Sequence, residues 1–190
     1  MMAATNVKEV ILTEARGIAQ AHGYSGMNFR ELADRVGIKP ASIYHHFASK
    51  ADLGAAVARR YWEDAAANLA AIQAEEADPK ASLRRYPEVF RRSLESENRL
   101  CLGSFMSAEH DDLPEAVMKE VHAFTDVNTA WLSHMLVSAR IASSTVAAEA
   151  KARAIFASIA GAQLMARSRS DIALFDSLVD AYREAGLLPA

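Results

Sequence analysis

The amino-acid sequence predicts an all-α fold. Glycine and proline are scarce, at 8 and 5 of 190 residues, while alanine and leucine are abundant. No segment shows the sustained alternation of apolar and polar residues that is typical of a strand. We therefore expect about nine helices, arranged as an N-terminal three-helix region with a helix-turn-helix and a C-terminal helical bundle.

The first two helices are predicted from spacing and end signals. Apolar residues recur at helical spacing over about residues 5–22, and Gly23 is a natural C-terminal stop. A short helix starts at Asn28, which with Glu31 has the spacing of a capping box. Gly37 ends this second helix.

The third helix is predicted over about residues 40–47, because its leading proline suits a first helical turn. Ile43 and Phe47 lie one turn apart and are expected to face inward. A fourth helix begins near Ser49, whose hydroxyl can cap it, and continues to about residue 76.

The segment "RELADRVGIKPASIYHHF" (30–47) predicts a helix-turn-helix, two short helices joined by a tight glycine turn. Ala33 is small where the helices approach, and Ile38 and Ile43 hold the second helix against the first. The alternative is two packed short helices in an all-α core. The residues left to face outward are Lys39, Ala41, Ser42, Tyr44 and His45.

The rest of the chain predicts five further helices, at about 80–97, 99–110, 114–140, 145–167 and 171–185. "AIFASIAGAQLMA" (154–166) is apolar or small nearly all round, so it is expected to be buried on more than one side. We predict a two-fold dimer built as a four-helix bundle, the alternative being a core helix in a monomer. The predicted interface residues are Ala157, Ala160, Gly161, Leu164, Phe175, Leu178, Val179 and Tyr182.

Charge is distributed unevenly along the chain. Residues 28–60 carry six Lys/Arg against three Asp/Glu, whereas residues 66–190 carry thirteen against seventeen. Phosphate affinity depends on where the basic residues lie and not on the whole-chain charge of −3. A locally basic N-terminal segment on an acidic body is what a small nucleic-acid contact needs.

The composition also bears on location. No apolar run approaches the roughly 20 residues of a membrane span, and the N-terminus has no basic start followed by an apolar segment. The single cysteine, Cys101, cannot form an internal disulfide. We expect a cytoplasmic protein with no membrane partner.

Residues 11–53, "ILTEARGIAQAHGYSGMNFRELADRVGIKPASIYHHFASKADL", resemble the DNA-binding domain of the tetracycline-repressor (TetR) family. The shared features are Gly23-Tyr24, the Ala33/Gly37 spacing and the run Ile43-Tyr44-His45-His46-Phe47 followed by Lys50 and Leu53. The resemblance implies a DNA-binding domain over 5–65, with the helix-turn-helix at about 28–47, and an effector-binding and dimerisation domain over 66–190.

That resemblance implies a homodimeric transcription regulator, usually a repressor, whose third helix enters the major groove of a palindromic operator. A small molecule bound in the body would change the separation of the two DNA-binding heads and release the DNA. No cofactor is implied.

Site residues follow from the same resemblance. Tyr44 and Lys50 match phosphate contacts, and Asn28 lies where backbone contact is common. Lys39, Ala41, Ser42 and His45 occupy recognition-helix positions that read base edges and nearby phosphates. Lys39 departs from the family's usual serine or threonine cap, which replaces a capping acceptor with positive charge beside DNA.

The effector pocket is predicted from large apolar side chains with few polar anchors, which suit a hydrophobic small molecule. The candidates are Trp62, Phe90, Phe105, Met106, Phe124, Trp131 and Met135, with His110, His122, Asn128 and His134 as polar contacts.

Two other functions stay open at this point. Cys101, close in sequence to Arg99, could make the protein a thiol-based redox regulator. His110, Asp111 and Asp112 could serve a helical-bundle metal-dependent enzyme. We expect neither an enzyme nor a metal site, because no nucleophile–base pair or phosphate-binding loop accompanies these residues.

Overall fold

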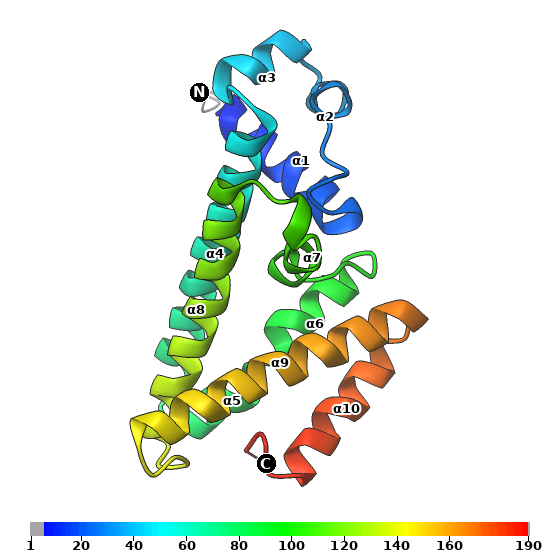
Figure 1. Ribbon diagram of the computed structural model, residues 1–190. Coiled ribbons are helices and arrows are strands. Elements are labelled where there is room, and N and C mark those ends of the chain that lie inside the picture. The colour runs from blue at the N-terminus through cyan, green and yellow to red at the C-terminus, as the bar shows by residue number, and fades with distance from the viewer. Residues whose placement is uncertain (1–5, 190) are drawn as a thin grey trace, which may run out of the picture. The chain divides into compact units, whose positions relative to one another are not determined.

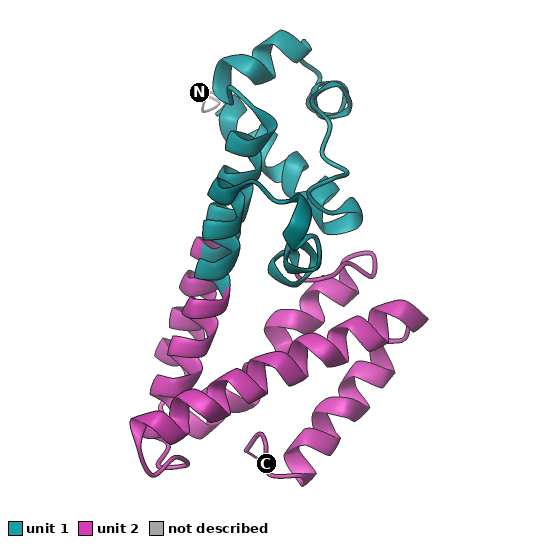
Figure 2. Cartoon of the chain, in the orientation of Figure 1, with its two compact units in different colours: residues 1–62, 102–124 teal, residues 63–101, 125–190 magenta. Residues whose placement is uncertain are grey.

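A computed structural model describes residues 6–189, which form ten α-helices, one short 3-10 helix and no strand (Figure 1). The predicted all-α class is confirmed. The chain divides into two compact units: unit 1 holds residues up to 62 together with 102–124, and unit 2 holds 63–101 together with 125 onward (Figure 2). The predicted domain ends at residues 5 and 190 lie outside the described residues, and the functional division at residue 65 stays a prediction.

Unit 1 contains the N-terminal helices and a later segment of the chain. Its complete elements are α1 (Val7–His22), α2 (Phe29–Val36), α3 (Pro40–His46), α7 (Leu102–Ala108) and the 3-10 helix η1 (His110–Asp112). Two long helices, α4 (Lys50–Glu75) and α8 (Glu115–Ser138), start in unit 1 and continue into unit 2. Within the described residues, no helix combines the length and apolar character of a membrane span.

Helix starts follow the predicted capping residues. The Asn28 side chain accepts from the amides of Arg30 and Glu31 at 2.8 and 3.3 Å. Only this half of the expected capping box is seen, because the Glu31 carboxylate pairs with Arg35 one turn on. Ser49 Oγ accepts from the Asp52 amide at 3.1 Å at the start of α4.

The core of unit 1 is built from α1, α2, α3 and the first half of α4, closed by α7 and the start of α8. Two glycines permit close packing there. A Cβ on Gly54 would collide with the ring of Tyr24, and one on Gly103 would collide with Phe124. The fully buried aliphatic side chains of this core include Ile11, Ile18, Leu32, Ile43, Leu53 and Val117.

Unit 2 contains α5 (Pro79–Arg85), α6 (Glu88–Glu95), α9 (Thr145–Arg169) and α10 (Ile172–Glu184). The single helix predicted over 80–97 was wrong: two short helices occupy that segment. Pro87 has no N–H to donate back into a continuous helix, and it instead stands as the N-cap of α6.

The helix predicted over 99–110 is also shorter than expected. Glu97 and Asn98 have φ of 59° and 55°, in the left-handed region, so α7 begins only at Leu102. The Asn98 side chain holds this turn by donating through Nδ2 to the Arg167 carbonyl at 3.0 Å. Beyond α7, residues 110–112 form η1, which lies between two of the predicted helices.

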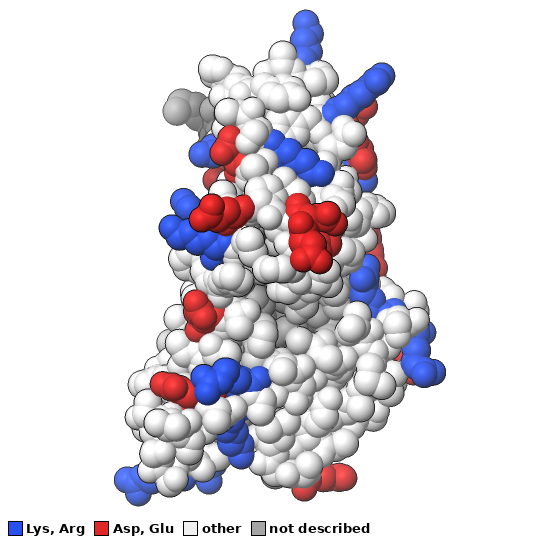
Figure 3. Space-filling view, in the orientation of Figure 1, with Lys and Arg blue, Asp and Glu red and all other residues white. Residues whose placement is uncertain are grey.

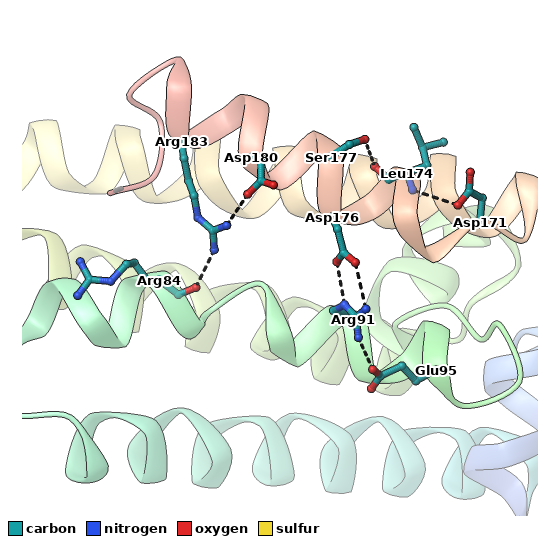
Figure 4. A network of polar contacts seen from close by, with 9 residues as sticks. All are labelled: Arg84, Arg91, Glu95, Asp171, Leu174, Asp176, Ser177, Asp180 and Arg183. Atoms are coloured by element: carbon teal, nitrogen blue, oxygen red, sulfur yellow. Dashed lines mark hydrogen bonds and ion pairs between the residues drawn. The ribbon is translucent and has the colours of Figure 1, made fainter.

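Polar contacts fix α10 within unit 2 (Figure 4). Arg91 of α6 donates through Nε and Nη2 to the two carboxylate oxygens of Asp176, at 2.7 and 3.0 Å. Arg183 bonds Asp180 and reaches the carbonyl of Arg84 at 3.3 Å. Because these side chains are partly exposed, the pairs contribute orientation more than stability.

Candidate nucleic-acid interface

The helix-turn-helix is formed by α2 and α3 around a small apolar contact. Ala33 and Ile43 are fully buried, and Phe47 at the end of α3 is nearly so, as their spacing predicted. Gly37 ends α2 with φ 75° and ψ 32°, and the amide of Ile38 donates to the Ala33 carbonyl at 3.0 Å. This left-handed turn sets the direction in which α3 leaves α2.

The outward side of α3 carries the predicted contact residues. Lys39, Ala41, Tyr44 and His45 are exposed, whereas Ser42 is half-buried. Lys39 precedes Pro40 and makes no side-chain cap, as expected for a side chain that has no acceptor atom. Lys and Arg side chains project from the end of unit 1 at which α2 and α3 lie (Figure 3).

Tyr44 is 58% exposed, and its ring packs on Phe29 with centroids 4.7 Å apart. Phe29 directly follows the α2 cap Asn28, which is itself exposed. The start of α2 therefore supports the Tyr44 ring from one side and leaves the hydroxyl available for a hydrogen bond.

Lys50, at the first turn of α4, is held by the loop between α1 and α2. Its Nζ donates to the Ser25 carbonyl at 3.0 Å and lies 4.7 Å from the centroid of the Tyr24 ring. The pKa of the Tyr24 hydroxyl is raised because its ring is buried. An ammonium has three N–H donors, so one Ser25 bond leaves others free for a phosphate.

The same loop is also bound by Glu109, a residue that sequence reasoning missed. Glu109 lies between α7 and η1, and its carboxylate accepts from the amides of Tyr24 and Ser25 at 2.6 and 3.0 Å. Gly23, at φ 73°, makes room for it, since an added Cβ would collide with the carboxylate. No spacing rule pairs residues so distant in the sequence.

The predicted effector residues divide between the two units. In unit 1, Met106 and Phe124 are buried, and Phe105 is half-buried. The Trp62 indole donates to Glu120 at 2.8 Å, while His110 is exposed on η1. These side chains belong to the core of unit 1 or to its surface.

In unit 2, three predicted residues meet around a residue that sequence reasoning missed, Tyr86. The Tyr86 ring stacks on Trp131 at 5.8 Å and lies 5.7 Å from Phe90, and its hydroxyl donates to Asn128 at 2.9 Å. Burial raises the pKa of Tyr86 well above its usual value. Met135, also of unit 2, is buried.

A groove of about 630 Å³ lies between α8 and α9 in unit 2. Of its lining only His134 was a predicted polar contact, and the other side chains are mostly small or polar, with both signs of charge. The lining residues are Asp126, Thr129, Ala130, Ser133, His134, Val137, Thr145, Glu149 and Arg153.

The predicted dimer residues lie on two faces of α9 and α10. Ala157, Gly161 and Leu164 are exposed on α9, and Leu164 is 55% exposed. Ala160, Leu178 and Tyr182 are half-buried, whereas Phe175 and Val179 are buried within the chain itself.

The structure does not favour the metal-dependent enzyme or the thiol-based redox regulator. His110, Asp111 and Asp112 are all exposed on η1, and residues 6–189 hold no group of three His, Cys, Asp or Glu side chains suited to a metal ion. Cys101 is 2% exposed, and its amide donates to Gln163 at 3.0 Å.

Residues 11–57 match the family described as bacterial regulatory proteins, tetR family. Over 62 residues, 33% of this chain, the sequence is 42% identical to the HTH-type transcriptional repressor AcnR of Corynebacterium glutamicum, and the match spans 31% of that protein's length.

Two solved structures are similar over nearly the whole chain. A transcriptional regulator of the TetR family from Agrobacterium tumefaciens is 29% identical, with 94% of this chain and 96% of that chain covered and a TM-score of 0.87. A TetR transcriptional regulator from Legionella pneumophila is 26% identical, with 97% and 99% covered and a TM-score of 0.89.

Proposed function

We propose, from the premise that this chain belongs to the tetR family of bacterial regulatory proteins, that it is a homodimeric repressor released from a palindromic operator by a hydrophobic small molecule. The observation that carries the DNA-binding part is the outward side of α3. It presents Lys39, Ala41, Tyr44 and His45 to solvent while Ile43 anchors the helix in the core.

The contact residues have two different roles. Tyr44 and Lys50 offer a hydroxyl and an ammonium to phosphates, which positions the protein without reading sequence. Ser42 and His45 can bond base edges, and Ala41 can meet a thymine methyl. Asn28 and Lys39 add contacts to the DNA backbone.

Selection of bound sequences from random duplex DNA, with the purified full chain, tests this function. We expect enrichment of a palindrome. Tyr44→Phe and Lys50→Ala should weaken binding to all sequences alike, and Lys50→Ala should lower the salt slope by about one. His45→Ala should change the preferred sequence, with His46→Ala as the matched neighbour that leaves it unchanged. Absence of any enriched sequence at low salt contradicts the proposal.

The exposed apolar side of α9 supports the dimer. Leu164 and Met165 are 55% and 48% exposed, and the small residues Ala157 and Gly161 lie on earlier turns. Covering such a stripe with a second copy removes it from water. Leu164→Asp should give a monomer by analytical ultracentrifugation, whereas Val146→Asp, at an exposed position near the start of α9, should stay dimeric.

The aromatic group around Tyr86 supports the effector site. Trp131 Nε1 is buried and has no hydrogen-bond partner among the described residues. An unpaired buried donor costs about 1–3 kcal/mol, so a ligand that supplies an acceptor gains by pairing it. We expect a largely apolar, aromatic effector with one such acceptor. Compounds that release the operator should act less well on Trp131→Phe, and equal release would contradict this assignment.

A further inference from the structure

The loop between α1 and α2 makes hydrogen bonds with two side chains, those of Glu109 and Lys50. Glu109 receives the amide hydrogens of Tyr24 and Ser25, at 2.6 and 3.0 Å from the two carboxylate oxygens. The next carbonyl of the same loop, that of Ser25, receives a hydrogen bond from Lys50 Nζ at 3.0 Å. Thus a carboxylate from the 102–124 segment and an ammonium from α4 are joined through one short piece of backbone.

The geometry makes this loop the support for the Lys50 side chain. The Tyr24 ring packs at Gly54, one turn after Lys50 on α4, and it lies under the ammonium. A lysine side chain has several freely rotating bonds, and ordering it for one contact costs side-chain entropy. The Ser25 carbonyl and the Tyr24 ring restrict this freedom before any DNA arrives.

We propose that Glu109 is a positioning residue for DNA binding, which fixes the loop of Tyr24 and Ser25 and thereby holds the Lys50 ammonium ready for a backbone phosphate. The inference rests on the proposed function, since it needs Lys50 to meet DNA. It adds a residue well outside the segment of 11–57 that matches the family. Glu109 acts through the loop and Lys50 and does not itself contact DNA.

Considered by charge alone, removal of Glu109 should raise DNA affinity, whereas the proposed positioning role predicts that it lowers DNA affinity. Loss of a negative charge from a DNA-binding protein strengthens its attraction to phosphates. Loss of the loop support frees Lys50 and weakens the ordered contact. The direction of the change in DNA affinity therefore separates the two effects.

The test uses the full chain and a labelled pool of random duplex DNA, because phosphate contacts do not depend on sequence. Affinity is measured across a salt series for wild type, Glu109→Ala, Glu109→Gln and Asp111→Ala. Asp111 is exposed on η1 and serves as the charge control. Urea unfolding of each variant, followed by circular dichroism, confirms that the protein measured is folded.

We expect Glu109→Ala to bind every sequence more weakly and its salt slope to fall toward that of Lys50→Ala, by up to about 0.9 for one phosphate contact. Glu109→Gln keeps one acceptor oxygen and should fall between wild type and Glu109→Ala. Asp111→Ala should bind as well as wild type or better.

The double variant Glu109→Ala/Lys50→Ala completes the cycle. If Glu109 acts through Lys50, its removal should not change the salt slope once Lys50 is gone. A purely structural Glu109 would instead give additive losses with an unchanged slope, which overturns the inference. Failure of wild type itself to bind DNA overturns the proposed function, so the two failures are told apart.

Discussion

Glu120 is the buried carboxylate whose removal has the most definite expected effect. It is 5% exposed and joins α8 to α4 within unit 1. One oxygen accepts from Arg59 at 2.6 and 3.2 Å, and the other accepts from the Trp62 indole at 2.8 Å. In Glu120→Gln, the amide NH₂ must face one of these donors, which removes the hydrogen bond between that donor and residue 120.

The expected cost is about 2 kcal/mol, because Glu120 is buried and a hydrogen bond to a charged group contributes about 1.5–3 kcal/mol. The Arg59 contribution is discounted, since its side chain is 57% exposed and solvent screens the pair. For a chain of this length, about 2 kcal/mol lowers Tm by about 4–8 °C.

The effect should depend on pH in a definite direction. Arg59 hydrogen bonding, assisted by Trp62, lowers the pKa of Glu120 against the opposing effect of burial. A carboxylate with a lowered folded-state pKa stabilises the fold above its unfolded pKa of about 4.3, and this contribution is lost as pH falls through the folded pKa. The difference in Tm between wild type and Glu120→Gln should therefore shrink below about pH 4.

The assay is thermal unfolding followed by tryptophan emission in a Trp131→Phe background. Trp62 is then the sole tryptophan of the chain, and it reports directly on the Glu120 contact. Equal Tm values for the two proteins at pH 7, or a difference that stays constant down to acid pH, would refute the reasoning.

Substitutions at three further positions test the packing and the turn of the helix-turn-helix and, in unit 2, the hydrogen bond of Tyr86. Ile43→Ala should cost about 2–5 kcal/mol by urea unfolding, since Ile43 is fully buried; a loss under 1 kcal/mol contradicts that. Gly37→Ala should cost about 1 kcal/mol at its left-handed φ of 75°, and Gly37→Asn clearly less; equal costs would exclude backbone strain. Asn128→Leu should cost about 1–3 kcal/mol by leaving the Tyr86 hydroxyl unpaired, a loss that a Tyr86→Phe background should reduce.

Local signals in the sequence were enough to predict the helix-turn-helix. The stop at Gly37, the proline that starts α3 and the cap at Ser49 each act within a few residues, so spacing rules apply to them. Pro87 is a signal of the same kind, and the continuous helix predicted across it was wrong because proline has no N–H to donate within a helix.

Contacts between distant segments were not predictable in this way. Glu109 meets Tyr24 across 85 positions, and Arg91 meets Asp176 across 85 positions. From the sequence, a glutamate before a 3-10 turn is expected to be a solvated side chain. Only the tertiary fold places the amides of Tyr24 and Ser25 beside it. Phe90 and Trp131, the aromatic partners of Tyr86, were predicted as pocket residues because they are large and apolar. Their contact with Tyr86 depends on tertiary packing, which the sequence does not show.

The division of unit 1 into two separate stretches of sequence bears on how such a gene can be rearranged. A single crossover near codon 62 transfers α1 to α3 and the first half of α4 but leaves residues 102–124 behind. The transferred piece would lack Met106 and Val117, which complete its core, and the Glu109 carboxylate that holds its loop. Under the proposed function, exchange of DNA-binding specificity between relatives by recombination therefore requires either two exchanged segments or substitutions confined to the surface of α3.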